Sequence, residues 1–234
     1  NNIKFSGAGL DSYEAYLPEN INYKGTNISF VAASDRHGQY NNTQPFLNAG
    51  YKKMGFANAD VHDIDLIIDS LYEFSDLNVV ELHSGYEYSQ TPPAGDRTTT
   101  EYESYNPFLN VPMEADMEFR HELADHRNVD LIVAHHPHVL QGVEFYNNTL
   151  IVHSLGNFIF DSNFPETFSS MLFYANVEND IFTEYEFKPI FIDHYVTKPA
   201  TGELGKQILD YVANLSKDMD TTVSVNKYGN AQLD

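Results

Sequence analysis

Three histidines fall within four consecutive positions of the segment "HHPH", at His135, His136 and His138. They come directly after the apolar run "LIVA", residues 131–134, which is typical of a buried strand. Neutral imidazoles are common protein ligands of zinc, manganese and iron. Burying three imidazoles together without a ligand is costly in desolvation. The cluster therefore predicts a metal site.

A further histidine, His83, ends a predicted buried strand at residues 78–83. In open α/β sheets, ligands bind beyond the carboxyl ends of the strands. Both histidine groups are therefore expected at one edge of a sheet, where His136 and His138 can turn toward one point. The remaining histidines considered are interpreted as ordinary core or surface residues: His37, His62, His121, His126 and His194.

Three polar residues near these strands are candidates for chemistry. Glu87 follows His83 by four residues, and is either a metal ligand, proton donor or substrate contact, or a surface carboxylate. Asn157 follows Gly156 in an expected tight turn between two strands. It either turns its side chain into the cleft or caps its own backbone. Ser154 is not expected to be a nucleophile, because "HSLGN" is not the G-x-S-x-G turn of a hydrolase.

The first half of the chain alternates strands and helices, which predicts an α/β sheet. Apolar residues at helical spacing predict a helix through Ile64, Ile67, Ile68 and Leu71. The other expected elements are two strands around Gly25 and Thr26 within 21–34, a long loop at 36–60, a strand at 78–83, a long loop at 84–112, a charged helix at 113–128 and a strand at 129–136.

The second half of the chain changes character, and residues 169–192 alternate in period two. It predicts hairpins around Asn147-Asn148 and Asn179-Asp180, with a short strand after the first hairpin. A final amphipathic helix is expected through Leu204, Ile208, Tyr211, Val212 and Leu215.

Composition limits the classes of partner. The chain has 234 residues and a net charge of −21, so a nucleic-acid partner is not expected, because phosphate backbones bind Lys- and Arg-rich faces. It has no cysteine, so a metal must be held by His, Asp, Glu or Asn. No apolar run approaches the roughly 18–20 residues of a membrane helix, and the first ten residues are not expected to act as a signal peptide, because they contain no basic segment followed by an apolar one.

Three segments carry a family resemblance: "GAGLDSYEAYLP", "VVELHSGYEYSQTPP" and "VDLIVAHHPHVLQGVEFYNNTLIVHSLGNFIFD". Together they resemble the bacterial capsule-synthesis protein CapA family, the poly-γ-glutamate capsule proteins. The resemblance implies a calcineurin-like metallophosphoesterase fold, an α/β sandwich of mixed sheets flanked by helices, as one domain over residues 1–234. Departures from the family are Ser84 for Trp, Ala134 for Gly and His153 for Tyr. They concern the substrate rather than the fold.

The resemblance also implies a site. His83, His136 and His138 would bind divalent manganese, iron or zinc, with two ions in the intact protein, while Glu87, His135 and Asn157 would shape the cleft. Such a metal pair would clamp a phosphate for in-line attack by a bridging hydroxide. The expected partner is an anionic polymer or a phosphoester substrate, and the expected location is extracellular or in the cell envelope.

One part of the family pattern is missing. The family's first Asp ligand and an Asn-His pair precede the "GAG" segment, which here begins at Gly7. We expect this chain to lack the N-terminal portion of the domain. That portion would belong to a longer polypeptide, come from a second chain or segment, or be lost. In the last case the protein would be a non-catalytic polymer-handling, anchoring or structural component with an incomplete metal site.

Overall fold

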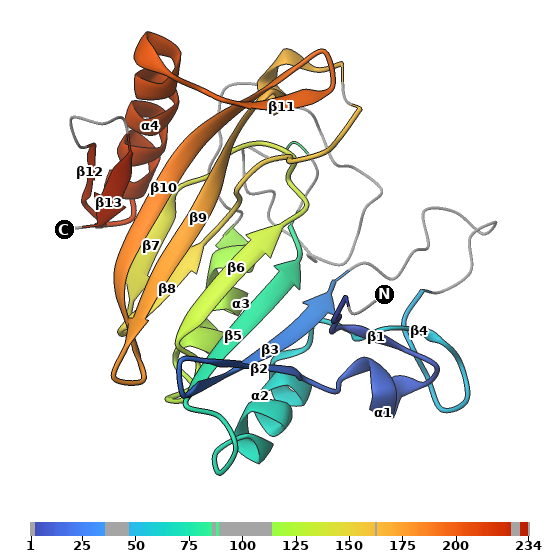
Figure 1. The fold of residues 1–234 in the computed structure, drawn as a ribbon. Helices are drawn as coiled ribbons and strands as arrows, with labels where there is room; N and C mark the ends of the chain where they lie inside the picture. Colours follow the sequence, from blue (N-terminus) through green and yellow to red (C-terminus); the bar gives the residue numbers. More distant parts are fainter. Residues whose placement is uncertain are drawn as a thin grey trace.

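The computed structural model of the protein describes residues 3–35, 47–85, 88, 114–161, 163–225 and 230–233. Within these residues the central layer is a six-stranded sheet in the order β2-β3-β5-β6-β8-β7 (Figure 1). The four inner strands are parallel, and the two outer strands run antiparallel to their neighbours. The strands are β2 (Glu19–Tyr23), β3 (Thr26–Ser34), β5 (Leu77–His83), β6 (Leu131–His135), β7 (Val143–Tyr146) and β8 (Thr149–Val152).

The inner strands form because both faces of the sheet are covered. Parallel strands of this kind are near-continuous apolar runs, and every residue of β8 is buried. The strands expected at 78–83 and 129–136 are confirmed as β5 and β6. The expected first hairpin is also confirmed: β2 and β3 meet at a turn where Lys24 and Gly25 have φ of 53° and 103°.

Helices cover one face of this sheet (Figure 1). α2 (Val61–Ser70) begins after Asp60, whose carboxylate accepts a hydrogen bond from the Asp63 backbone N–H at 3.2 Å. Its buried residues Ile64 and Ile68 belong to a core shared with the sheet, as the spacing predicts. α3 (Glu114–Ala124) is shorter than the expected helix at 113–128. Beyond it, the Asn128 N–H bonds to the side chain of His126 rather than to a helical carbonyl.

The second sheet lies against the other face of the first. Among the described residues it has the order β11-β10-β13-β12, with β9 also paired to β10. The hairpins expected around Asn147-Asn148 and Asn179-Asp180 are confirmed as β7-β8 and β9-β10. The strands are β9 (Ser169–Glu178), β10 (Ile181–Asp193), β11 (Val196–Pro199), β12 (Val223–Val225) and β13 (Ala231–Leu233).

The last long helix, α4 (Gly202–Lys217), packs against β10, β12 and β7. It confirms the expected amphipathic helix, but its buried face is shifted. Leu204 and Tyr211 are 40% and 38% exposed, whereas Ile208, Leu209 and Val212 are buried in the second core. The remaining short elements are β1 (Ala8–Gly9), α1 (Ser12–Ala15), β4 (Gly55–Phe56) and the 3-10 turn η1 (Pro165–Thr167).

The short strand expected after the β7-β8 hairpin is not formed. Only Leu155 makes an isolated bridge, to Leu140. Phe158 and Ile159 lie on the surface, 52% and 81% exposed. The apolar run at 158–160 is typical of a strand, but no layer of the described structure covers Phe158 and Ile159, and the next strand begins at Ser169.

The close packing of α4 yields a stability prediction. A Cβ added at Gly205 would lie 2.4 Å from the backbone oxygen of Ala200. Gly205→Ala should therefore lower the free energy of unfolding by about 1–3 kcal/mol, because the clash outweighs the roughly 1 kcal/mol helix advantage of alanine. Urea denaturation tests this. Gly50→Ala is the control, because its Cβ would meet only Lys53 Cβ at an ordinary 3.7 Å. Equal stability of the Gly205 variant and the wild type would contradict this packing.

Candidate functional site

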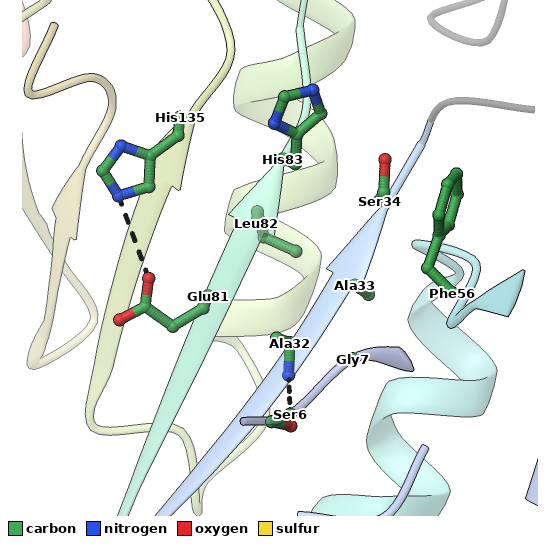
Figure 2. Close-up of a pocket in the computed structure, with 10 residues that line it drawn as sticks. All are labelled: Ser6, Gly7, Ala32, Ala33, Ser34, Phe56, Glu81, Leu82, His83 and His135. Carbon is green, nitrogen blue, oxygen red and sulfur yellow. Dashed lines mark hydrogen bonds and ion pairs between the residues drawn. The ribbon is translucent and has the colours of Figure 1, made fainter. Parts of the chain in front are cut away.

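The parallel register brings the ends of three strands level. Ser34 of β3 pairs with His83 of β5, and His83 pairs with His135 of β6. Hydrogen bonds continue past the strand ends, from Ser84 N to His135 O at 3.0 Å and from Asp35 N to His83 O at 3.2 Å. His83 and His135 therefore stand side by side at the carboxyl edge of the sheet, where the sequence placed them (Figure 2).

The segment after β6 folds back toward His83. The ring centroids of His83 and His136 are 4.5 Å apart, and those of His136 and His138 are 5.9 Å apart. His136 and His138 have φ of 108° and 61°, in a region that residues with a Cβ rarely adopt. Backbone strain of this kind is found at functional sites, where the surrounding structure enforces it.

Asn157 orients one of these rings. The Asn157 Oδ1 and His138 Nδ1 atoms are 2.7 Å apart. Because an amide oxygen only accepts hydrogen bonds, the proton of the imidazole lies on Nδ1, and Nε2 keeps its lone pair. A hydrogen bond to the other ring nitrogen is the usual way to orient a metal-binding histidine. The buried Asn157 follows Gly156, which has φ of 74°.

Two cavities meet at the cluster. One, of about 390 Å³, is lined by all four histidines of the two strand ends and by Asn157. The other, of about 540 Å³, is lined by His83, His135, Ser34 and Glu81 (Figure 2). The cleft is thus built from the strand ends of β3, β5 and β6 and from the turn around Gly156.

Glu81 is a site residue that the sequence reasoning missed. It lies on the same face of β5 as His83, with its carboxylate 3.9 Å from His135 Nε2 (Figure 2). Burial raises the pKa of Glu81 to about 7, because apolar side chains such as Phe30 and Val133 share its cavity. One signal was available: a charged residue two positions before His83 must share its face of the strand.

The proton state of His135 is set by its surroundings. Burial, together with the nearby Arg120 guanidinium, lowers the pKa of His135. The imidazole is therefore neutral at pH 7, and it can accept a proton from a neighbouring group or donate a hydrogen bond. Glu87, the other predicted site residue, lies outside the described residues. Its neighbour Tyr88 donates its backbone N–H to Pro137 O at 2.9 Å and packs 5.7 Å from the His138 ring.

The donor chemistry at the cluster fits a divalent transition metal, since His83, His136 and His138 are imidazoles and His138 is oriented through Asn157. In the described part of the chain, however, no three His, Asp or Glu side chains are placed so as to hold one ion together. Convergence requires a ring to turn, and His83 is exposed whereas His136 and His138 are half-buried. The residue types therefore suit a divalent metal, but the three side chains do not converge on one point in the described structure.

The fold and site define an α/β sandwich with a histidine cluster at the carboxyl edge of its central sheet. Residues 105–162, which contain the HHPH segment, match the family model described as "Bacterial capsule synthesis protein PGA_cap". The chain is 27% identical over 220 residues to "PGA biosynthesis protein CapA" of Bacillus subtilis strain 168, covering 93% of this chain and 50% of that protein. It is 30% identical over 132 residues to "Capsule biosynthesis protein CapA" of Bacillus anthracis, covering 56% of this chain and 27% of that protein.

The chain is thus similar to CapA proteins of bacterial capsule synthesis. It spans about half the length, or less, of the curated relatives it matches. Among solved structures, a putative 5′-nucleotidase from Staphylococcus aureus in complex with alpha-ketoglutarate is similar with a TM-score of 0.41 and 12% identity, over 92% of this chain and 36% of that one. The expected α/β sandwich of mixed sheets flanked by helices is confirmed.

None of the helices in the described residues combines the length and the apolar character that a membrane span needs.

Proposed function

We propose that this chain forms part of a divalent-metal-dependent phosphoester hydrolase that acts in capsule polymer synthesis at the cell envelope. One observation carries the proposal: the imidazoles of His83, His136 and His138 gather at the carboxyl edge of a parallel sheet, where α/β proteins bind ligands. Similarity to capsule synthesis proteins supports the biological setting.

In this proposal the metal is held by His83, His136 and His138. A divalent ion, or a pair of them, would supply Lewis-acid chemistry, polarising a phosphoryl oxygen and offsetting its charge. The ions would be manganese, iron or zinc, which suit imidazole ligands. The substrate class is a phosphoester or a phosphate-bearing part of the polymer pathway.

The protein's own groups have distinct tasks. Asn157 holds His138 with Nε2 directed away from their hydrogen bond. Glu81, whose pKa is raised to about 7, can hold or release a proton near neutral pH. The neutral His135, 3.9 Å away, is a neighbouring partner for that proton. The cavities on both sides of His83 give a substrate access to these groups.

The test is hydrolysis of bis(p-nitrophenyl) phosphate by the natural protein that contains this chain, with manganese added or removed by chelation. We expect metal-dependent hydrolysis, and a fall in kcat/KM of at least about 100-fold in His136→Ala, because removing a ligand removes charge stabilisation in the transition state. His194→Ala, a fully surface histidine 94% exposed at the side chain, is the matched control and should stay active.

A second function is favoured by one observation, the open arrangement of the cluster. Since the described residues do not place three ligands around one point, the protein could instead handle or retain the polymer without catalysis. The net charge of −21 opposes direct contact with a polyanion. Polymer binding that survives His136→Ala, together with the absence of metal-dependent hydrolysis in the wild type, would favour this second function and overturn the first.

A further inference from the structure

Arg120 is a buried cation that connects two strand ends behind the histidine cluster. It lies on α3 and is 1% exposed. Its Nη2 donates to Ser84 Oγ at 3.0 Å and to Ser84 O at 3.4 Å. Its Nη1 donates to His153 Nδ1 at 2.8 Å and to His153 O at 3.4 Å. Ser84 directly follows β5 and His153 directly follows β8, so one guanidinium joins the carboxyl ends of both strands.

The position of these two strands makes the connection significant. In the sheet, β6 lies between β5 and β8, and the end of β6 carries His135 and continues into His136 and His138. The guanidinium therefore links the strands on both sides of the one that bears the cluster. A shift of either flanking strand would change the separation of His83 from His136, which is now 4.5 Å between ring centroids.

The charge of Arg120 is balanced through a chain of side chains. A guanidinium only donates hydrogen bonds, so Nδ1 of His153 must accept, and the proton of that imidazole lies on Nε2. Nε2 faces Glu144 Oε2 at 3.1 Å. Burial lowers the pKa of His153 to about 4, so this ring is neutral and connects the buried cation to the Glu144 carboxylate.

Glu144 is itself held in its charged form. Burial alone would raise the pKa of Glu144. The hydrogen bonds from His153 and His121 outweigh burial and bring this pKa below its usual value. His121 Nε2 lies 2.9 Å from the carboxylate, and its ring stacks on Tyr146 at 3.9 Å. The buried guanidinium is thus connected through His153 to the Glu144 carboxylate, which His121 also contacts.

The turn after His83 is fixed from other sides as well. Gly85 N donates to Asp35 Oδ2 at 2.9 Å. Gly85 has φ of 100°, and a Cβ there would lie 3.0 Å from Asp116 Oδ2. Residues 83–85 therefore have little room to move, and Arg120 holds the residue in the middle of this turn.

We propose that Arg120 is a positioning residue of the histidine site: by joining the ends of β5 and β8 it sets the placement of His83 relative to His136 and His138. This proposal rests on the proposed function, in which His83, His136 and His138 bind the metal. A guanidinium suits the task because its planar fork bonds two groups at once, which a lysine ammonium on a flexible stem does not. Lysine at this position would keep the charge and lose one of the two strand contacts.

The first experiment needs no metal. Backbone and imidazole ¹H–¹⁵N shifts of the natural protein containing this chain are compared between the wild type, Arg120→Lys and Ser84→Ala, which removes only one hydrogen bond and is the milder change. We expect the signals of His83, His136 and His138 to move in both variants. Leu209→Ala is the control for lost stability, because Leu209 is buried in the second core on α4. It should leave these signals in place.

The second experiment measures cobalt(II) binding by its visible absorption band, which reports the ligand geometry. We expect cobalt affinity to fall by about 10–100-fold in Arg120→Lys, the usual size for a residue that orients ligands. Ser84→Thr, which keeps the hydroxyl, should bind cobalt more tightly than Ser84→Ala. Unchanged histidine signals in both Arg120→Lys and Ser84→Ala overturn the proposal, as does an equal effect of Leu209→Ala. If the histidine signals shift in the variants but the wild type has no phosphodiesterase activity, the positioning role stands and the proposed function is overturned.

Discussion

Glycine at position 136 is expected to weaken divalent-metal binding at least about 100-fold, and yet to give a more stable fold than alanine at the same position. The φ of 108° at His136 costs a residue with a Cβ about 1–3 kcal/mol, a cost that glycine avoids. The greater freedom of glycine in the unfolded chain takes back about 0.4–1 kcal/mol. We therefore expect His136→Gly to exceed His136→Ala by about 1 kcal/mol in free energy of unfolding.

Zinc titration calorimetry and urea denaturation measure the two quantities on the same samples. His194 provides a matched pair, because it also has a positive φ, 49°, and lies on the surface. His194→Gly should likewise exceed His194→Ala in stability while leaving zinc binding unchanged. Wild-type zinc affinity in His136→Gly would contradict its role as a ligand. A more stable alanine variant would contradict the strain.

Acid is expected to destabilise the wild-type protein more than the variant His153→Gln. The pKa of His153 falls to about 4 in the fold from its ordinary 6.5. Between these pH values the unfolded chain holds a proton that the folded chain does not, so stability rises with pH in this window and is lost as pH falls. The full shift corresponds to about 3 kcal/mol, of which about 2 kcal/mol is lost between pH 7 and pH 4.5. Glutamine can accept from Arg120 and donate to Glu144, but it gains no proton.

Urea denaturation at pH 4.5, 5.5 and 7 in the presence of a chelator measures this difference, and comparing two proteins cancels the other titrating groups. Glu81→Gln supplies a control of opposite sign. Since the pKa of Glu81 is raised to about 7, the folded state holds that proton more tightly, and its contribution to stability falls as pH rises from about 4.5 to 7. Parallel stability profiles for wild type and His153→Gln would show that His153 is not buried in its neutral form.

The elements that carry His83 and His135 were predictable from sequence because their physical causes are local. Apolar runs that end in histidine indicate buried parallel strands, and the parallel register then places these ends together. The turn residues Asn147-Asn148 and Asn179-Asp180 adopt positive φ in the predicted hairpins. Here the sequence pattern and the tertiary structure require the same conformation.

Other features depend on tertiary contacts that a sequence pattern does not contain. Arg120 lies in a segment so rich in charge that all its charged residues resemble a solvated helix face, yet this one is buried. Positive φ at His136 and His138 arises from the path of the chain between β6 and the turn around Gly156. The exposed Phe158 and Ile159 show the reverse case, where an apolar run is typical of a strand but no sheet of the described residues lies against it.

Because β3, β5 and β6 are paired in one register, the packing of the two hydrophobic cores also fixes which face of the sheet the site residues occupy. Because side chains alternate between faces, a slip of β5 by a single residue would turn Glu81 and His83 toward the helices and bring Val80 and Leu82 to the cleft. Such a slip would remove Val80 and Leu82 from the core under α2 and α3. The misaligned sheet would therefore be less stable than the native one. The burial of apolar side chains therefore places His83 and His135, which lie on strands. His138, which lies on a loop, depends on individual contacts such as its hydrogen bond with Asn157.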